Sequence, residues 1–258
     1  MKKPYVVPNI ITALGLSIGL FVIFKTVLYD PTFEPKTLLF KSAILILVAA
    51  CVDVLDGFVA RRLKGESLFG MNFDSLSDAI TFGVVPSVLL MKTATIEPKS
   101  IAYFLTFLAA MLFSLCGVLR LVRFNVSSVD ELKPKQKKIY TGLPIPAAAL
   151  AAISMQLILK EPIVMETIGV DFCTILSALG VIALSYLMIS LRRFESLKWI
   201  QKSQLDFNHV FLISLIVLTL LFGFMYYFAW VFVLVTWTYV ISGVFRGITG
   251  WWIEVEEI

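Results

Sequence analysis

The chain has 258 residues, of which 59% are apolar and only 16% are charged, and its mean hydropathy is +0.91. Soluble domains carry about 25% charged residues, so this composition excludes a water-soluble protein and favours one embedded in a bilayer. Basic loops at a membrane surface explain the net charge of +4, and no nucleic-acid partner is expected. His209 is the only histidine and the three cysteines are widely spaced, so zinc, disulfide or histidine-based chemistry is not expected.

Apolar stretches long enough to cross a bilayer follow one another along the chain, since a spanning helix needs about 20 residues. In chain order they are Pro4 to Phe24, Thr37 to Leu63, Phe73 to Met91, Ser100 to Leu119, Ile139 to Leu159, Phe172 to Leu191, and a longer run from Phe207 to Phe245 with room for two spans and a turn near Tyr226 to Ala229. The prediction is an all-α, polytopic transmembrane bundle of eight spans. Most of the basic residues fall in alternate connections, and the positive-inside rule then places both termini in the cytoplasm.

Four acidic residues lie inside these predicted spans, where charge is costly and usually functional. They are Asp53 and Asp56 in the second span, and Asp74 and Asp78 in the third. Their spacing places each pair on one face of its helix, and the short connection makes the two helices antiparallel neighbours. We therefore expect the four carboxylates to converge. Two divalent cations would relieve their repulsion, and oxygen-only ligands favour hard ions such as Mg²⁺ or Mn²⁺.

Small and basic residues share the face of the second span with the aspartates. Gly57 and Ala60 leave room for a phosphate to approach the backbone, and Arg61 offers a fork of donors that suits phosphate oxygens. Asp53 precedes Arg62 by about 13 Å along a helix, so the acids are expected in the cytoplasmic half of the bilayer. The pattern indicates a metal-bridged diphosphate site.

The segment Asp53-Val-Leu-Asp56-Gly57-x2-Ala60-Arg61-x8-Gly70-x3-Asp74-x3-Asp78 resembles the signature of the CDP-alcohol phosphotransferase family at all of its fixed positions. The resemblance implies a six-helix catalytic core, residues 1–206, and two additional helices in residues 207–258. It implies that Asp53, Asp56 and Asp74 are metal ligands, and that Asp78 ligates the second metal and is the general base. Contacts to the CDP group are implied for Gly57, Ala60, Arg61 and Gly70. The implied chemistry is in-line attack by an alcohol on the lipid-side phosphorus of a CDP-activated lipid with CMP leaving, in an enzyme that is usually a homodimer.

Two further segments resemble the membrane-embedded phosphatidylserine synthase branch, which implies CDP-diacylglycerol as lipid donor and L-serine as acceptor. They are Arg120-Leu-Val-Arg123-Phe124-Asn125 and Gly142-Leu143-Pro144-Ile145-Pro146. Arg123, Arg120 and Asn125 are therefore candidates for binding serine, and the two arginines suit its carboxylate. The alternative is that the arginines only anchor their helix at the headgroups.

Other polar residues near the predicted site are less informative. Asn9 and Thr12, which open the first span, are candidates for contacting the nucleotide, while the alternative for Asn9 is a helix cap. Pro144 and Pro146 are expected at a helix start, where proline is tolerated. Ser75 lies between the aspartates of the third span without an assignable role.

Three other functions compete with this interpretation. The same chemistry with glycerol 3-phosphate or inositol as acceptor is the nearest one. An ion-coupled transporter also places acids inside a membrane, but here all four lie on one adjacent helix pair near one leaflet. An inactive relative is disfavoured because all four aspartates are present. The expected location is a prokaryotic cytoplasmic membrane with the active site facing the cytoplasm.

Overall fold

The computed structural model describes residues 6–28, 34–63, 68–94, 100–129, 142–190, 223–224 and 226–255. Every regular element in these ranges is helical, which confirms the predicted all-α bundle. The elements are α1 (Val6–Val27), α2 (Pro35–Leu63), α3 (Leu68–Asp78), the π-helix η2 (Ala79–Val84), α4 (Val85–Thr93), α5 (Ile101–Val129), α6 (Ile145–Leu159), α7 (Pro162–Ile168), α8 (Val170–Ile189) and α10 (Phe228–Val255).

Six helices in the described ranges are long and apolar enough to cross a membrane. Counting α6 with α7, which are bent by 72° at their junction, as one span raises the number to seven. The protein is therefore a multi-pass membrane protein. The first of the two predicted C-terminal spans lies largely outside the described residues, so the count of eight stays a prediction. The second begins at Phe228, within the turn expected near Tyr226 to Ala229.

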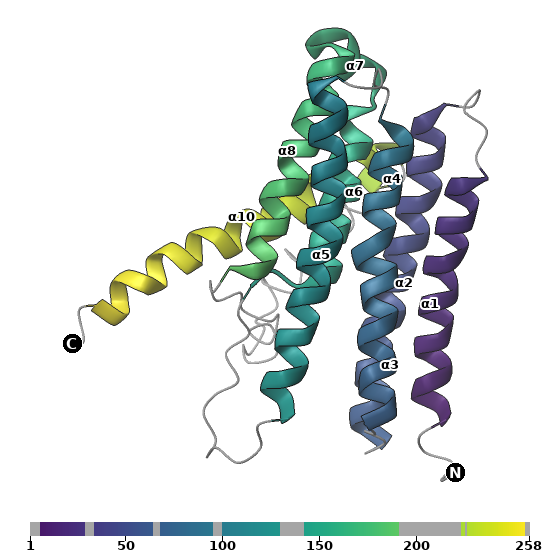
Figure 1. Cartoon of the computed structure of the whole chain (residues 1–258), viewed down its shortest axis with the longest axis vertical. Helices are drawn as coiled ribbons and strands as arrows, with labels where there is room; N and C mark the ends of the chain where they lie inside the picture. The colour runs from purple at the N-terminus through teal and green to yellow at the C-terminus, as the bar shows by residue number, and fades with distance from the viewer. Residues whose placement is uncertain are drawn as a thin grey trace, which may run out of the picture.

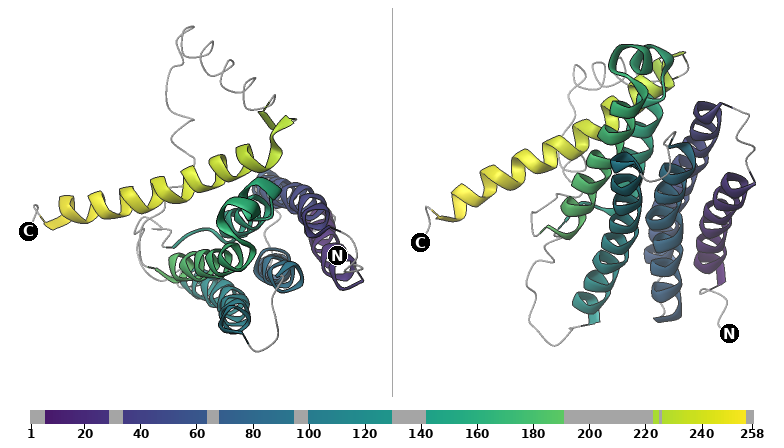
Figure 2. Two further views of the ribbon diagram at one scale, coloured as in Figure 1. Left: turned by 90° about the horizontal axis from the view of Figure 1, so that it is seen from above. Right: turned by 45° about the horizontal axis from the view of Figure 1, so that its top comes forward.

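The helices other than α10 and the short α7 run roughly along one axis, as Figure 1 shows. The start of α1, the start of α3 and the end of α5 lie at the same end of the bundle (Figure 1). Helix α10 packs across α6, and its C-terminal half extends away from the other helices at a steep angle (Figure 2).

Helix α6 is the centre of the packing. Its alanines Ala148, Ala149, Ala151 and Ala152 are fully buried, and such small side chains allow neighbouring helices to approach closely. Helices α2, α8 and α10 all pack against it. On the side of α5, a Cβ atom added to Gly117 would lie 2.9 Å from Ile145 Cδ1, so glycine leaves room for this side chain of α6.

The third predicted span is a column of three pieces, α3, η2 and α4. The π-helical turn begins directly after Asp78, and π-helical insertions occur frequently at functional sites. Thr81 of η2 lies against Gly19 of α1, where an added Cβ would overlap the threonine side chain. Helix α1 is thus held close to the segment that carries two of the aspartates.

Two details of the helix ends bear on the sequence-based expectations. Helix α1 begins at Val6, so Asn9 lies inside its first turn, and the alternative that Asn9 is a cap was wrong. Pro144 is the N-cap of α6 and Pro146 lies in its first turn, which confirms their expected place at a helix start. The short helix α7 was not predicted.

Candidate active site

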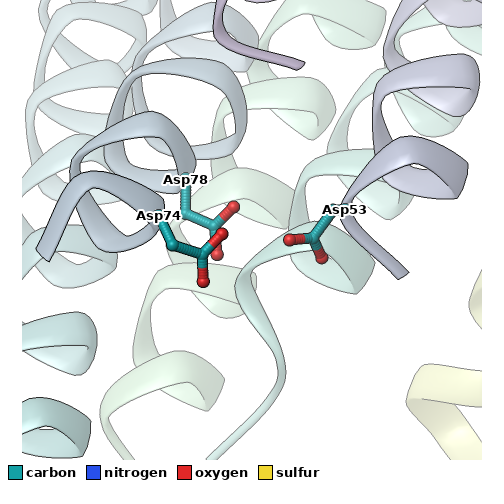
Figure 3. Close-up of side chains that lie close together, drawn as sticks. All are labelled: Asp53, Asp74 and Asp78. Carbon is teal, nitrogen blue, oxygen red and sulfur yellow. The ribbon is translucent and has the colours of Figure 1, made fainter. Parts of the chain in front are cut away.

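Three of the predicted acidic residues form one cluster. Asp53 of α2 and Asp74 and Asp78 of α3 each offer a carboxylate oxygen, and these oxygens all lie within 4.8 Å of one another. Asp74 and Asp78 are one helical turn apart and point toward Asp53 across the space between the two helices (Figure 3). The expected convergence of these carboxylates is therefore confirmed, but the expected direct packing of the two helices is not: in the described residues α2 and α3 both pack mainly against α1.

The fourth acid, Asp56, lies beside this cluster and contacts α1. Its Oδ2 accepts a hydrogen bond from the Thr12 hydroxyl, while its Oδ1 is buried without a hydrogen-bond partner. Asp56 is only 5% exposed, so a carboxylate oxygen here is removed from water without being satisfied by the protein. A buried, unpaired acceptor of this kind is costly and is what a bound cation or donor group would satisfy.

A pocket lined by all four aspartates opens between α1, α2 and α3. Thr12 and Ser77 also line it, and the Ser77 hydroxyl donates to the Thr12 carbonyl oxygen at 3.4 Å. Within the described residues, no lysine or arginine forms an ion pair with these carboxylates. Converging carboxylate oxygens that form no ion pair among the described side chains fit a hard divalent cation.

The residues predicted to contact CDP lie on the same two helices. Gly57 follows Asp56 on α2 and is half-buried, and Gly70 lies one turn before Asp74 on α3. Ala60 and Arg61 belong to α2, but their side chains lie outside the described part of the chain. Asn9 lies on α1 about one turn before Thr12 and is half-buried.

Arg120 of α5 faces the aspartate cluster. Its guanidinium interacts electrostatically with Asp78, with Arg123 and with Tyr239 of α10. Its Nε is buried and has no hydrogen-bond partner. An arginine donor therefore lies near Asp78 with capacity to bind a further acceptor group.

Arg123, one turn further along α5, is engaged in a different contact. Its Nη1 donates to the Ile189 carbonyl oxygen at 2.8 Å, and Nη2 lies 3.5 Å from the Met188 carbonyl oxygen, both at the C-terminal end of α8. Gly142, whose φ is +85°, packs against this junction, and a Cβ there would overlap the Met188 carbonyl oxygen. Arg123 thus satisfies carbonyl groups that a helix end leaves without partners.

Asn125 of α5 contacts Ser75, a residue to which the sequence assigned no role. Its Nδ2 donates to the Ser75 hydroxyl oxygen at 2.9 Å, and Ser75 immediately follows Asp74 on α3. The sequence carried one signal for Ser75 and Ser77, namely polar side chains inside an apolar span. Their partners come from distant helices and could not be read from spacing.

Comparisons with known proteins agree with this geometry. The family model described as CDP-alcohol phosphatidyltransferase matches residues 5–183, which run from α1 into α8. Similar curated proteins include a CDP-diacylglycerol–serine O-phosphatidyltransferase of Helicobacter pylori, 32% identical over 84% of this chain and 82% of that protein. The enzyme of the same name from Methanocaldococcus jannaschii is 28% identical over 83% and 84%, respectively. An archaetidylserine synthase of Methanothermobacter thermautotrophicus is 42% identical over 45% of this chain, which spans about half (46%) of that protein's length.

Proposed function

Since this chain belongs to the CDP-alcohol phosphatidyltransferase family, we propose that it transfers a phosphatidyl group from CDP-diacylglycerol to L-serine, giving phosphatidylserine and CMP. The observation that carries the chemistry is the convergence of Asp53, Asp74 and Asp78, with Asp56 beside them. The choice of serine is supported by the names of the three relatives, all of which contain it.

The four aspartates are the residues that would hold two divalent cations, Mg²⁺ or Mn²⁺. When bound, such cations stabilise negative charge on the attacking and leaving oxygens of a phosphoryl group. Gly57, Ala60, Arg61 and Gly70 lie on the same helices and are proposed to contact the CDP group. Asn9 and Thr12 of α1 are proposed to contact it too, and Thr12 lines the aspartate pocket.

In the proposed reaction the serine hydroxyl oxygen forms a bond to the lipid-side phosphorus, and the bond from that phosphorus to the CMP oxygen breaks. The proton of the serine hydroxyl passes to the Asp78 carboxylate, and CMP leaves with the electron pair. Asp78 suits this role because it ends α3 next to the π-helical turn and lies near Arg120, the proposed ligand of the serine carboxylate. A base must lie within hydrogen-bond reach of the proton that it accepts.

Arg120 is the better of the two arginines for holding the serine carboxylate. It faces Asp78 and retains a buried, unpartnered Nε, whereas Arg123 donates to the end of α8. Binding the carboxylate at Arg120 would bring the serine hydroxyl toward Asp78. Inositol has no anionic group for Arg120 to bind, so this assignment distinguishes serine from inositol. The phosphate of glycerol 3-phosphate would suit the guanidinium as well, so that acceptor is separated by the assay below.

We further propose that the active site faces the cytoplasm and that the protein is a homodimer in a prokaryotic cell membrane. The basic residues in alternate loops support the orientation. The core of residues 1–206 would carry the reaction, and residues 207–258 would be an addition to it.

An acceptor panel tests the proposed function. Purified protein in detergent is given CDP-diacylglycerol and one of L-serine, glycerol 3-phosphate or inositol, and CMP release is measured. We expect CMP with serine alone. If CMP is released with glycerol 3-phosphate or inositol but not with serine, that compound is the acceptor and the serine assignment is wrong. If no acceptor gives metal-dependent CMP release, transferase activity is rejected in favour of a transporter.

A further inference from the structure

Ser75 and Asn125 join two helices that otherwise have little contact at this level of the bundle. Asn125 Nδ2 lies 2.9 Å from Ser75 Oγ, and Asn125 Oδ1 lies 3.1 Å from the same atom. The Ser75 hydroxyl also lies 3.0 Å from the Met71 carbonyl oxygen, one turn earlier on α3. The hydroxyl can therefore donate to Met71 while it accepts from the amide of Asn125.

This pair bears on the rotation of α3. Helix α3 packs mainly against α1, and it has few other contacts with α5. Ser75 is the residue after Asp74, so the two side chains leave α3 about 100° apart, one toward α5 and the other toward α2. A bond that fixes the direction of Ser75 also fixes the direction of Asp74.

We propose that Asn125 is a positioning residue, which together with Ser75 holds α3 in the rotation that aims Asp74 at Asp53 of α2, and that it does not contact the acceptor. This assigns Asn125 a different role from the serine contact that the sequence pattern suggests. It rests on the proposed function only in treating the aspartate cluster as the cation site.

The chemistry of the pair supports this role. Both side chains are half-buried on helices within the membrane-spanning part of the bundle, where an amide and a hydroxyl without partners would be costly. The Asn125 amide donates to the Ser75 hydroxyl, so each polar group has a hydrogen-bond partner and the Asn125 side chain is directed at α3. Residues that orient metal ligands in this indirect way commonly affect metal affinity when they are replaced.

The test measures cation binding directly, without turnover. Mn²⁺ is titrated into the purified full-length protein in detergent, and free Mn²⁺ is followed by electron paramagnetic resonance for wild type, Ser75→Ala, Asn125→Ala and the double variant. We expect each single variant to weaken Mn²⁺ binding by about tenfold, the lower end for residues that support metal ligands. The double variant should be no weaker than either single one, because each change breaks the same bond. Ser75→Thr, which keeps the hydroxyl, should restore wild-type binding.

A matched pair elsewhere serves as the control. Ser114 of α5 and Ser87 of α4 are joined by a hydrogen bond of 2.9 Å between their hydroxyls, well away from the aspartates. Ser114→Ala should leave the Mn²⁺ Kd unchanged. Weaker Mn²⁺ binding in this variant as well would mean that any lost polar contact of α5 lowers the affinity, rather than the loss of the contact that positions Asp74.

Two results would overturn the inference. One is an unchanged Mn²⁺ Kd in the folded Ser75→Ala and Asn125→Ala variants, as judged by circular dichroism and size-exclusion chromatography. The other is a rise in the serine KM of Asn125→Ala alone, which would mark Asn125 as an acceptor ligand. If the wild-type protein binds Mn²⁺ but does not use serine, the proposed function fails. The Mn²⁺ affinities of wild type and variants then still test the positioning role of Asn125.

Discussion

The hydroxyl of Thr12 on α1 donates a hydrogen bond to Oδ2 of Asp56 on α2. This contact joins the first helix to the carboxylate that lies beside the three-aspartate cluster, and it leaves Oδ1 of Asp56 for another partner. Helix α1 is thus part of the candidate site rather than only a membrane anchor.

Replacing Thr12 by valine should lower kcat/KM for CMP release by about 10- to 100-fold, because a hydrogen bond to a charged group contributes about 1.5–3 kcal/mol. Thr12→Ser should keep most of the activity. Thr26→Val on the same helix is the control, since the Thr26 hydroxyl donates only to its own helix at the Val22 carbonyl oxygen. Equal losses in Thr12→Val and Thr26→Val would contradict a specific role for the Asp56 contact.

Replacing Asp78 by asparagine should reduce kcat by about 10²- to 10⁴-fold, the usual contribution of a general base. The side chain keeps its size, so the helical content measured by circular dichroism should not change. Asp171→Asn, in the first turn of α8, is the matched control and should remain active. Turnover retained in Asp78→Asn would remove Asp78 as the base.

Replacing Arg120 by glutamine should raise the serine KM by at least about tenfold through loss of a charge-assisted hydrogen bond. The KM for CDP-diacylglycerol should change little, because the proposed contact is to the acceptor alone. Steady-state kinetics with each substrate varied in turn separates the two constants. A rise confined to the lipid KM would place Arg120 on the donor side instead.

Replacing Arg123 by glutamine should lower stability more than it changes the serine KM. The variant loses the donor to the Ile189 carbonyl oxygen at the end of α8, and a cation at a helix C-terminus contributes about 0.3–2 kcal/mol. Thermal unfolding in detergent measures the effect, with Lys25→Gln as a comparison, since the half-buried Lys25 lies over the Phe21 ring of its own helix and bridges no two helices in the described part of the chain. An unchanged melting temperature with a higher serine KM would favour the serine contact expected from the sequence.

The sequence was sufficient for those features that depend on spacing within one helix. Asp53 and Asp56 share a face because they are three residues apart, and Asp74 and Asp78 because they are four apart. The structure brings Asp53, Asp74 and Asp78 together as expected, although α1 packs against both helices and they make few contacts with each other. The family assignment rested on the same spacing and is confirmed by the match over residues 5–183.

Features that depend on contacts between distant helices were not predictable in the same way. Nothing near Arg123 in the sequence indicates that its guanidinium reaches the end of α8, some sixty residues later. The same holds for Asn125 and Ser75, and for the approach of Gly19 to Thr81. The bend between α6 and α7 and the π-helical turn after Asp78 are likewise set by packing, which overrides local pattern.

The most direct test of the central claim is whether lipid transfer to serine depends on a divalent cation and on the aspartate cluster together. Purified protein is treated with EDTA, and CMP and phosphatidylserine are then measured after Mg²⁺ or Mn²⁺ is returned with CDP-diacylglycerol and L-serine. We predict equal amounts of the two products in the wild-type protein only when a cation is present, and none in Asp53→Asn or Asp74→Asn. Equal product formation with and without the cation, or full activity in those variants, would contradict a cation-dependent transfer at the aspartate cluster.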